Sequence, residues 1–368
     1  MPTPTLEKQI YENYWPSLDS KIATCMSGGV DSSVSAYLLS QKGYEVIGLT
    51  GWLIKGSGRC CDNGMIDAAK ICEQINVNHI SKDLRVFFKQ EIVDPFINSY
   101  SVGSTPIPCI TCNTSIKWGL LMQHAFDELN CTHIATGHYA KLVKDKDGFK
   151  IVRPKDSKKD QTFMLWGLTQ EVLSRTVFPL GDLIKEEVRE VGRKGNLFVA
   201  DKEESQDICF VSDKEGTQGF LGKHLESKEG YIIENKTKRI LGFHQGTHNF
   251  TIGQRKGLGI AYSEPLYVID LDVEQNIVYA GTKEELEGCE LIAKDVNWTL
   301  PFVGVGRDCS VRAKIRYNSP TSPATVTILE NNQVKVVFNE PQSAITPGQA
   351  CVFYDKDDQV LLGGGWIV

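Results

Sequence analysis

The sequence predicts an α/β domain built on a parallel sheet, followed by one or two small all-β domains of the barrel type. Up to about residue 230, short apolar runs alternate with segments of helical periodicity, which is typical of strand–helix–strand units with helices on both faces of a sheet. Beyond that point short strands follow one another with turn residues between them, which favours small β-barrels. With 368 residues, 41% of them hydrophobic, and a net charge of −6, the chain has the composition of a globular protein of two or three domains.

The first part of the chain supplies the elements of the parallel sheet. Apolar patterns predict strands at 21–26, 45–49, 78–80 and 132–136, and helices at 32–41, 66–75 and 117–129. The helix at 32–41 is expected to bury one face, made of Val34, Tyr37, Leu38 and Gln41. The uncharged stretch 95–116 contains three prolines and many hydroxyl side chains, so we expect a loop region there.

The second part is expected to contain strands only. They are predicted at 231–233, 266–271, 277–280, 310–316, 324–329, 334–338, 350–354 and 360–364, with a turn at 274–276 joining the second to the third. These patterns divide the chain into an N-terminal extension (1–20), the α/β domain (21–222), a small central β domain (223–288) and a C-terminal β-barrel domain (289–368).

Composition excludes several classes of protein. No stretch approaches the roughly 18 consecutive apolar residues of a membrane-spanning helix. The first twenty residues lack both the apolar core of a signal peptide and the arginine-rich, acid-poor composition of a transit peptide. Eleven cysteines, scattered through a long chain, argue against a disulfide framework and for a reducing compartment. We therefore expect a cytoplasmic protein without a membrane partner.

A glycine-rich loop is the first candidate functional motif. The strand at 21–26 runs into the segment 27–33 (Ser-Gly-Gly-Val-Asp-Ser-Ser) and then into a helix. Paired glycines let several backbone N–H groups meet one anion, and the helix N-terminus adds partial positive charge. A simple turn with a helix cap would explain two glycines alone, but the whole segment after the first parallel strand favours a phosphate site. No Gly-x-x-x-x-Gly-Lys-[Ser/Thr] motif occurs, so the loop is not a Walker A loop.

Two cysteines are candidate nucleophiles. Cys112 follows two prolines and precedes the predicted helix that carries Lys117, and a helix N-terminus favours a thiolate. Cys209 lies in a polar segment farther along the chain. Residue chemistry alone leaves two alternatives open, namely small buried hydrophobic residues and half of a zinc site completed by Cys60, Cys61 or Cys72.

Seven motifs, in one order, resemble those of the tRNA-specific 2-thiouridylase family (MnmA/TrmU), which belongs to the PP-loop N-type ATP pyrophosphatases. They occupy residues 25–34, 105–113, 135–139, 159–161, 205–210, 251–259 and 346–350. The resemblance implies an adenine nucleotide alpha hydrolase-like first domain and the ATP-dependent exchange of the 2-carbonyl oxygen of the wobble uridine for sulfur in Lys, Glu and Gln tRNAs. A PP-loop enzyme that amidates or ligates a small molecule is the less favoured reading.

The resemblance also implies roles for individual residues. Cys112 corresponds to the nucleophile and Cys209 to the cysteine that carries a persulfide, supplied by a cysteine desulfurase or a sulfur-relay protein. ATP with Mg²⁺ is expected at Cys25, Met26, Ser27, Gly28, Gly29, Val30, Asp31 and Ser32, with adenosine at Gly137 and at Gly51, just past the second strand. The protein is expected to act as a monomer.

Contacts with tRNA are implied at a further set of positions. They are Ile107, Pro108, Cys109, His138, Lys159, Asp160, Gln161, Arg316, Tyr317 and Gln349. Lys155 and Lys158 add to a basic cluster with Lys159, and Arg312, Lys314 and Arg316 alternate as if on one face of a strand. Tyr317 could stack on an unpaired base.

Cys109 departs from the family pattern. Many members carry an aspartate there, proposed to act as acid and base, and a thiol is not ionised like a carboxylate at neutral pH. Either another group such as His138 handles protons, or Cys109 does so as a thiolate. A third alternative is a [4Fe-4S] cluster held by Cys109, Cys112 and Cys209. The sequence does not choose between persulfide relay and cluster.

Overall fold

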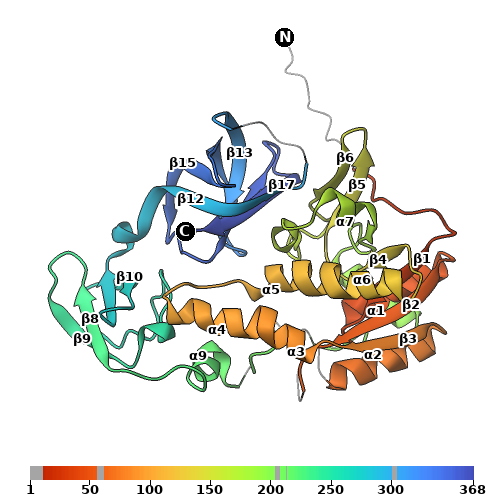
Figure 1. Ribbon diagram of the computed structural model, residues 1–368, viewed down its shortest axis with the longest axis horizontal. Coiled ribbons are helices and arrows are strands. Elements are labelled where there is room, and N and C mark those ends of the chain that lie inside the picture. Colours follow the sequence, from red (N-terminus) through yellow and green to blue (C-terminus); the bar gives the residue numbers. More distant parts are fainter. Residues whose placement is uncertain (1–10, 56–61, 204–207, 213, 301–304) are drawn as a thin grey trace, which may run out of the picture.

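The computed structural model describes residues 11–55, 62–203, 208–212, 214–300 and 305–368. Figure 1 shows the α/β domain, the four-stranded middle sheet and the C-terminal barrel, with the barrel above the helices that connect the other two. Within this part of the chain, no helix is long and apolar enough to cross a membrane.

A five-stranded parallel sheet forms the α/β domain. Its strands lie in the order β3-β2-β1-β4-β7, and every neighbouring pair is parallel. The strands are β1 (Lys21–Cys25), β2 (Glu45–Trp52), β3 (Asn78–Asp83), β4 (His133–Ala135) and β7 (Thr176–Val177). The predicted fold class is confirmed for this domain.

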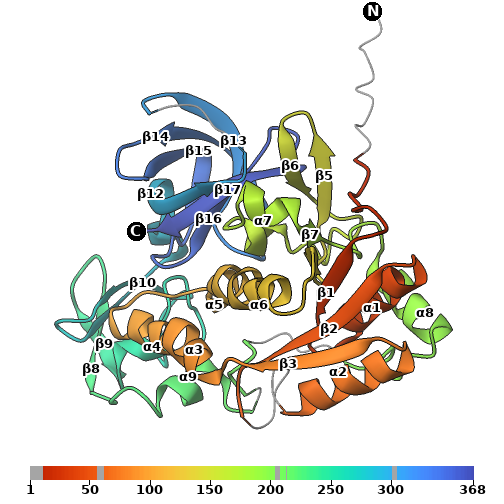
Figure 2. The same ribbon diagram turned by 45° about the vertical axis from the view of Figure 1, so that its right-hand side comes forward.

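Helices cover both faces of this sheet (Figure 2). One face packs against α1 (Val30–Gln41), α2 (Asp62–Gln74) and α8 (Lys185–Lys194), around a core that includes Val34, Ile71 and Val188. The other face packs against α3 (Arg85–Phe88) and α6 (Met122–Asp127), around Leu49, Phe88 and Ala125. The expected buried face of α1 is only partly right. Leu39 is fully buried, whereas Gln41 is exposed because the sheet lies on the side of Val34 and Leu39.

The stretch predicted as a loop is largely helical, so that expectation was wrong. A helical run continues from α3 through a π-helical turn (Lys89–Val93) into α4 (Asp94–Ser101). A second run begins with α5 (Pro108–Thr111), continues as a π-helix (Cys112–Leu121) and ends as α6. Pro95 and Pro108 stand in the first turns of α4 and α5, where the missing N–H costs nothing, so they start these helices instead of breaking them.

The middle domain is a four-stranded sheet in the order β10-β11-β8-β9. Its strands are β8 (Gly230–Glu234), β9 (Ile240–His244), β10 (Tyr267–Asp272) and β11 (Ile277–Gly281), preceded by helix α9 (Gly216–Leu221). The predicted turn between β10 and β11 is present, and the two strands are antiparallel. Strand β9 was not predicted. In the described residues beyond α9 the helices are single 3₁₀ turns, at Thr247–Asn249 and Lys283–Leu286.

Six strands close the C-terminal barrel. They follow the order β12-β15-β14-β13-β16-β17, and β12 also pairs with β17. Their bounds are β12 (Glu287–Trp298), β13 (Asp308–Lys314), β14 (Ser322–Ile328), β15 (Val334–Ser343), β16 (Ala350–Tyr354) and β17 (Val360–Ile367). Strand β12 was not predicted, and β13 ends at Lys314, so Arg316 lies beyond the strand on which it was expected to alternate with Arg312.

The barrel and the α/β domain share structure. The hairpin β5 (Lys141–Asp145) and β6 (Gly148–Val152), which was not predicted, extends the barrel sheet by pairing β6 with β17. A common core joins residues of the two domains, including Phe163 and Leu165 of the 3₁₀ turn Thr162–Leu165 and Tyr354 of the barrel. The short helix α7 (Gln170–Ser174) lies next to β6. The barrel is therefore fixed against the α/β domain by hydrophobic packing.

Part of the expected N-terminal extension is integral to this core, while residues 1–10 lie outside the described chain. The buried Asn13 side chain donates to the Phe178 carbonyl (2.8 Å) and accepts from the Leu142 N–H (2.9 Å). The Tyr14 ring meets Phe149 edge to face. Residues 11–20 thus hold the β5 strand against the end of the parallel sheet.

Candidate active site

The glycine-rich loop follows β1 at the carboxyl edge of the parallel sheet, as the sequence predicts. Gly28 has a φ of +70°, and a Cβ there would lie 2.5 Å from the carbonyl oxygen of Gly64, so only glycine fits. The Ser32 hydroxyl accepts from the Ser27 N–H (3.2 Å) and donates to the Gly29 carbonyl (3.1 Å), which closes the loop on itself. Helix α1 begins directly after it, at Val30. This arrangement presents backbone N–H groups and a helix N-terminus to one point in space.

Gly137 touches the start of α1 from the end of β4. A Cβ on Gly137 would lie 2.7 Å from the Ser32 nitrogen and 2.8 Å from the Asp31 carbonyl carbon. Gly51 lies inside β2, not past its end as expected, and it is buried against Leu53, Leu84 and Leu121. Both glycines thus permit close packing near the carboxyl edge, where ligands bind in this class of sheet.

Sequence reasoning missed the lysine that pairs with the loop. The Lys185 ammonium, only 7% exposed, donates to Asp31 Oδ1 at 2.6 Å, and the Tyr139 hydroxyl donates to the same oxygen at 2.8 Å. Gln161 holds Tyr139 by accepting from its backbone N–H (2.9 Å) and donating its own N–H to its carbonyl (3.0 Å). Lys185 begins an ordinary charged helix 154 residues after Asp31, so no local pattern marks it.

A second amine reaches the loop from the other side. Lys202 Nζ donates to the Gly28 carbonyl (3.2 Å) and to Asp67 Oδ2 (2.6 Å). Together with Lys185 it places two ammonium groups next to a loop of backbone N–H groups. Each ammonium is paired with an aspartate, so it is the concentration of N–H donors that suits a polyphosphate.

The two candidate cysteines pack against the same hydrophobic cluster, although they are far apart in the sequence. Cys112 and Cys209 are both half-buried cysteines on the core that includes Ile116 and Leu121. Cys112 is the first residue of the π-helix and lies one turn inside the run that starts at Pro108, not in front of a helix as expected. Residues 205–207 of the Cys209 motif lie outside the described chain.

An aromatic anchor explains the position of Cys209. The ring of the next residue, Phe210, meets three rings edge to face at centroid distances of 5.1 to 5.8 Å. These rings belong to Phe88, Phe96 and Phe220. The helical run α3–α4 therefore fixes the Cys209 segment on the same side of the sheet as Cys112.

Cys109 is exposed, yet protein atoms surround it densely. Desolvation raises its pKa, and the nearby Lys117 charge opposes that rise without cancelling it. Lys117 itself donates to Asn113 Oδ1 at 2.8 Å. The thiol of Cys109 is therefore neutral at pH 7, which disfavours the thiolate alternative.

His138 is buried, so its side chain does not lie on an RNA-accessible surface. Its ring contacts both Trp118 and Phe178, and its Nδ1 is 2.8 Å from the Thr136 hydroxyl. Burial, with a smaller contribution from Lys117, holds the pKa of His138 well below its usual value. The imidazole is neutral throughout the physiological pH range.

The donor sets for a metal do not fit in this structure. Among the residues that the structure describes, no group of three or more His, Cys, Asp or Glu side chains could hold a metal ion, and Cys109, Cys112 and Cys209 are no exception. Cys60 and Cys61 lie outside the described residues. Cys72 is buried beneath Gly48, and burial raises its pKa to about 12, so it is a core residue and not a ligand.

Several residues with an implied tRNA role serve the structure. The Asp160 carboxylate pairs with Arg153 and accepts from the Thr162 N–H (2.9 Å), and Arg153 in turn pairs with Asp358 of the barrel (2.7 Å). In the expected basic face, Arg312 also has a structural partner, because it donates a hydrogen bond to the Thr321 hydroxyl (3.0 Å).

Two implied tRNA residues, Gln349 and Arg316, lie at contacts between domains. Gln349 donates to the Thr105 carbonyl at 2.7 Å, four residues before Cys109. Arg316 donates to the Ala344 carbonyl next to Gly253 of the middle domain. Tyr317 lies edge to face with Phe163, and desolvation, followed by the charge of Asp160, raises its pKa.

These features define an α/β protein with a glycine-rich loop at the carboxyl edge of its parallel sheet and two cysteines on one hydrophobic cluster. Family models match three consecutive parts of the chain: tRNA methyl transferase HUP domain at residues 20–213, tRNA methyl transferase PRC-barrel domain at 218–282, and aminomethyltransferase beta-barrel domain at 289–367.

The chain is similar over nearly its whole length to curated proteins named tRNA-specific 2-thiouridylase MnmA. Identity is 47% over 349 residues with the protein of Nostoc punctiforme, 46% over 350 with that of Trichormus variabilis and 42% over 353 with that of Acaryochloris marina. Each alignment covers 94% of this chain and 98% of the relative. The chain therefore belongs to the tRNA-specific 2-thiouridylase family, as the sequence motifs predict.

A solved structure of the U34-tRNA thiolase NcsA from Methanococcus maripaludis, with its [4Fe-4S] cluster, matches more weakly. The TM-score is 0.34 at 21% identity, over 53% of this chain and 62% of that chain. A likeness of this size carries no argument about a cluster in this protein.

Proposed function

We propose that this protein is an ATP-dependent tRNA-uridine 2-sulfurtransferase that converts the wobble uridine of Lys, Glu and Gln tRNAs to 2-thiouridine. The observation that carries the proposal is the placement of Cys112 and Cys209 on one hydrophobic cluster that also contains Cys25, at the end of the strand that leads into the glycine-rich loop. Membership of the 2-thiouridylase family supports it.

The loop and its lysines would serve the first half-reaction. The uridine O2 attacks the α-phosphorus of ATP, the bond to the β-phosphate oxygen breaks, and pyrophosphate leaves. Gly28 and Gly137 keep side chains out of the phosphate cradle, while Lys185 and Lys202 add positive charge. Mg²⁺ commonly binds such sites through one or two carboxylates and the phosphates, and it would neutralise phosphate charge beside Asp31.

The two thiols would serve the second half-reaction. A sulfur donor, such as a cysteine desulfurase or relay protein, leaves a persulfide on Cys209. The Cys112 thiolate attacks the Cys209 sulfur, sulfide leaves and displaces AMP from C2 of the uridine, and a Cys112–Cys209 disulfide remains for reduction. Because the metal-donor set does not fit, we favour this relay over a cluster.

Two neutral groups are candidates for handling protons at this site. The raised pKa of Cys109 makes it a proton donor at neutral pH and not a base. His138 is neutral and enclosed. We propose that Cys109 acts as a thiol that donates a hydrogen bond to the target base.

The direct test is mass spectrometry of tRNA hydrolysates from a strain that lacks this protein. We expect 2-thiouridine to disappear and to return with the wild-type protein, but not with Cys112→Ser or Cys209→Ser. The serine variants should still release pyrophosphate, because the hydroxyl replaces only the thiolate chemistry. Unchanged 2-thiouridine in the deletion strain would overturn the proposal. We also propose a cytoplasmic location, because cysteines scattered through a long chain suit a reducing compartment.

A further inference from the structure

The middle domain contains a motif to which no function has been assigned, the glycine-rich loop at 251–259. Its first turn is braced by one side chain, because Gln254 accepts from the Thr251 N–H (3.1 Å) and donates to the Lys256 carbonyl (2.9 Å). The backbone of Gln254 also bonds to Val268 at the start of β10 (2.9 Å). The turn is therefore a built feature that holds Arg255 and Lys256 in defined positions.

This loop begins at the junction of the three domains. The Thr251 hydroxyl lies 3.3 Å from the hydroxyl of Thr105, and Thr105 belongs to the segment that leads to Cys109 and Cys112. Gly253 packs against Arg316 and has a φ of +86°. A Cβ added at this position would lie only 2.7 Å from Ala344 Cβ. The loop is thus continuous with the surface on which Arg316 and Gln349 lie.

The two cations at the tip of the turn are exposed. Neither Arg255 nor Lys256 forms an ion pair with any acid in the described part of the chain. Other cations of the same domain differ, because Lys236 lies 3.7 Å from Glu285 and Arg239 lies 3.6 Å from Glu234. Two adjacent, unneutralised cations on a rigid turn suit a polyanion.

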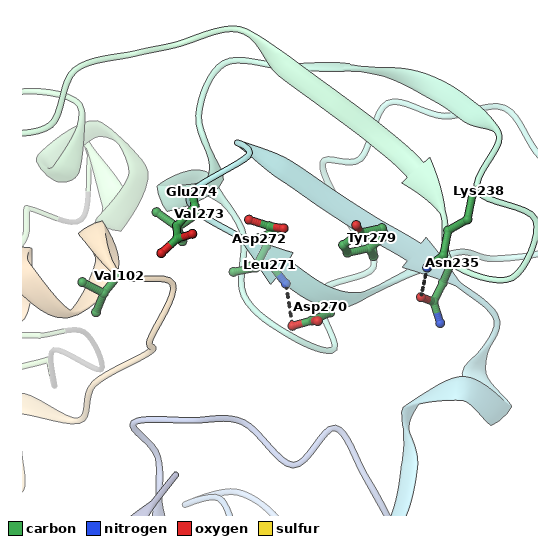
Figure 3. A pocket seen from close by; sticks show the side chains of 9 residues that line it. All are labelled: Val102, Asn235, Lys238, Asp270, Leu271, Asp272, Val273, Glu274 and Tyr279. Atoms are coloured by element: carbon green, nitrogen blue, oxygen red, sulfur yellow. Dashed lines mark hydrogen bonds between the residues drawn. The ribbon is translucent and has the colours of Figure 1, made fainter.

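Two hollows that adjoin the middle domain differ in charge. The hollow beside the loop, about 580 Å³, has a largely apolar lining, in which Arg255 and Glu264 are the charged side chains and Tyr262 is the aromatic one. The other, about 570 Å³, is lined by Asp270, Asp272 and Glu274, with Lys238 and Asn235 opposite (Figure 3). The carboxylates of the second hollow would repel a phosphate, whereas the first has room for a nucleotide and an exposed aromatic ring.

We propose that the 251–259 loop is a tRNA-binding element, in which Arg255 and Lys256 contact backbone phosphates next to the anticodon loop. The inference rests on the proposed function, which supplies tRNA as the substrate. Two adjacent cations that form no ion pair in the described part of the chain carry this inference, and the hydrogen bonds of Gln254 hold the turn on which they lie. The contact between Thr105 and Thr251 joins this turn to the segment that leads to Cys109 and Cys112.

The test compares the double variant Arg255→Ala/Lys256→Ala with the matched control Lys236→Ala/Arg239→Ala, which removes the same charge from the same domain. An unmodified tRNA transcript with a wobble uridine is titrated against each full-length protein between 50 and 200 mM salt. We expect the slope of log K against log[salt] to fall by roughly two units in the loop variant and to stay near wild type in the control. If the slope differs by two units, the ratio of the wild-type affinity to the variant affinity falls roughly 16-fold between 50 and 200 mM salt.

Two further readouts separate the possible outcomes. Thiolation by the wild-type protein in the same assay shows that the proposed function holds, so a failure of the loop variant is distinguishable from a failure of that function. Wild-type tRNA affinity and slope in the loop variant would overturn the inference. Unchanged tRNA binding with thiolation lost only when a protein supplies the sulfur would also overturn it, and would assign the loop to an acidic protein partner.

Discussion

Lys185 Nζ lies 2.6 Å from Asp31 Oδ1, and this ion pair joins the first turn of α8 to the first turn of α1. The Lys185 side chain is almost fully buried, whereas that of Asp31 is about one-third exposed. A buried ammonium beside a phosphate loop is held in place before the nucleotide arrives. Preorganised charge of this kind stabilises a transition state at little reorganisation cost.

Replacing Lys185 by methionine should therefore remove most of the adenylation activity. We expect pyrophosphate release in the presence of tRNA to fall by roughly 10²- to 10³-fold, because one charge donor aimed at the reacting phosphates is lost. The measurement is a coupled pyrophosphate assay at saturating ATP. Lys194→Met, at the exposed end of the same helix, is the matched control and should retain full activity.

The companion change Asp31→Asn tests the other member of the pair. It leaves the Lys185 charge without its partner but keeps the shape of the loop, so folding should persist while adenylation is lost. Pyrophosphate release at the wild-type rate by either Lys185→Met or Asp31→Asn would show that the pair only supports the structure.

Gly137→Ala should damage the phosphate loop from outside it. The new methyl group would lie 2.7 Å from the Ser32 nitrogen, and backbone atoms cannot move aside as a flexible side chain can. We expect a KM for ATP at least roughly tenfold higher and a loss of about 1 to 3 kcal/mol in the free energy of unfolding. Pyrophosphate kinetics and chemical denaturation measure the two effects.

Gly222→Ala serves as the control for that change. Gly222 has an ordinary helical conformation, and a Cβ there would meet its nearest neighbour at 3.4 Å, a normal contact. It should alter stability by less than about 0.5 kcal/mol. A normal KM for ATP in Gly137→Ala would contradict the assignment of this close approach to the nucleotide site.

The sequence predicts the architecture well where local pattern and tertiary structure agree. The parallel strands, the phosphate loop and the strand-rich second half follow from apolar periodicity and glycine placement. The helices at 94–101 and 108–116 were missed because Pro95 and Pro108 were interpreted as breakers, although proline also favours the first turn of a helix. Strand β12 was missed because half of its residues face solvent and interrupt the apolar pattern.

The site is less predictable because its long-range partners carry no local signal. Lys185, Tyr139 and Phe210 act through contacts across 30 or more residues, and only the fold brings them to Asp31 or to the Cys209 segment. The implied tRNA residues show the opposite limit. Asp160 matches a family position in sequence, but its carboxylate is committed to Arg153 and Thr162 in the structure.

The Cys109 thiol should titrate at a higher pH than an ordinary cysteine. Desolvation raises its pKa, and Lys117 lowers it by less, so the neutral thiol dominates at pH 7. We expect its alkylation rate to rise about tenfold per pH unit from pH 7 and to level off only above the range in which an ordinary thiol ionises. Removing the cation with Lys117→Met should shift that profile to still higher pH.

Mass spectrometry of peptides alkylated at each pH measures this profile, with the exposed Cys289 of β12 as a reference for reagent access. A plateau below pH 8 would show that the protein stabilises the thiolate, and Cys109 would then be available as a base. The pKa of His138 is held well below 6.5, so this residue does not titrate between pH 6.5 and 8. Any change of activity in that pH range should therefore persist when His138 is replaced.

The last prediction concerns Gln349, which the family resemblance assigns to tRNA and the structure ties to Thr105. Its amide donates to the Thr105 carbonyl at 2.7 Å, Thr105 in turn donates to the Pro347 carbonyl (3.0 Å), and Gly348 packs directly on Ser104. These contacts fix the segment that leads into the Cys112 helix against the barrel. If they position the nucleophile, Gln349→Ala should lower the kcat for thiolation by roughly 10- to 100-fold, since a displacement of the Cys112 thiol by about 1 Å is that costly. The Kd for tRNA should change less than about twofold.

A direct tRNA contact predicts the reverse pattern, namely a weaker Kd with kcat preserved at saturating tRNA, so single-turnover thiolation and tRNA titration together separate the two roles. Gln359→Ala, on a barrel turn where its amide bonds only to nearby carbonyls, is the matched control and should behave as the wild type. The alkylation rate of Cys112 gives an independent readout, because a loosened segment changes access to the thiol without any tRNA present. If Gln349→Ala left the alkylation rate of Cys112 and the kcat unchanged and raised the Kd for tRNA tenfold, Gln349 would be a direct tRNA contact and not a positioning residue.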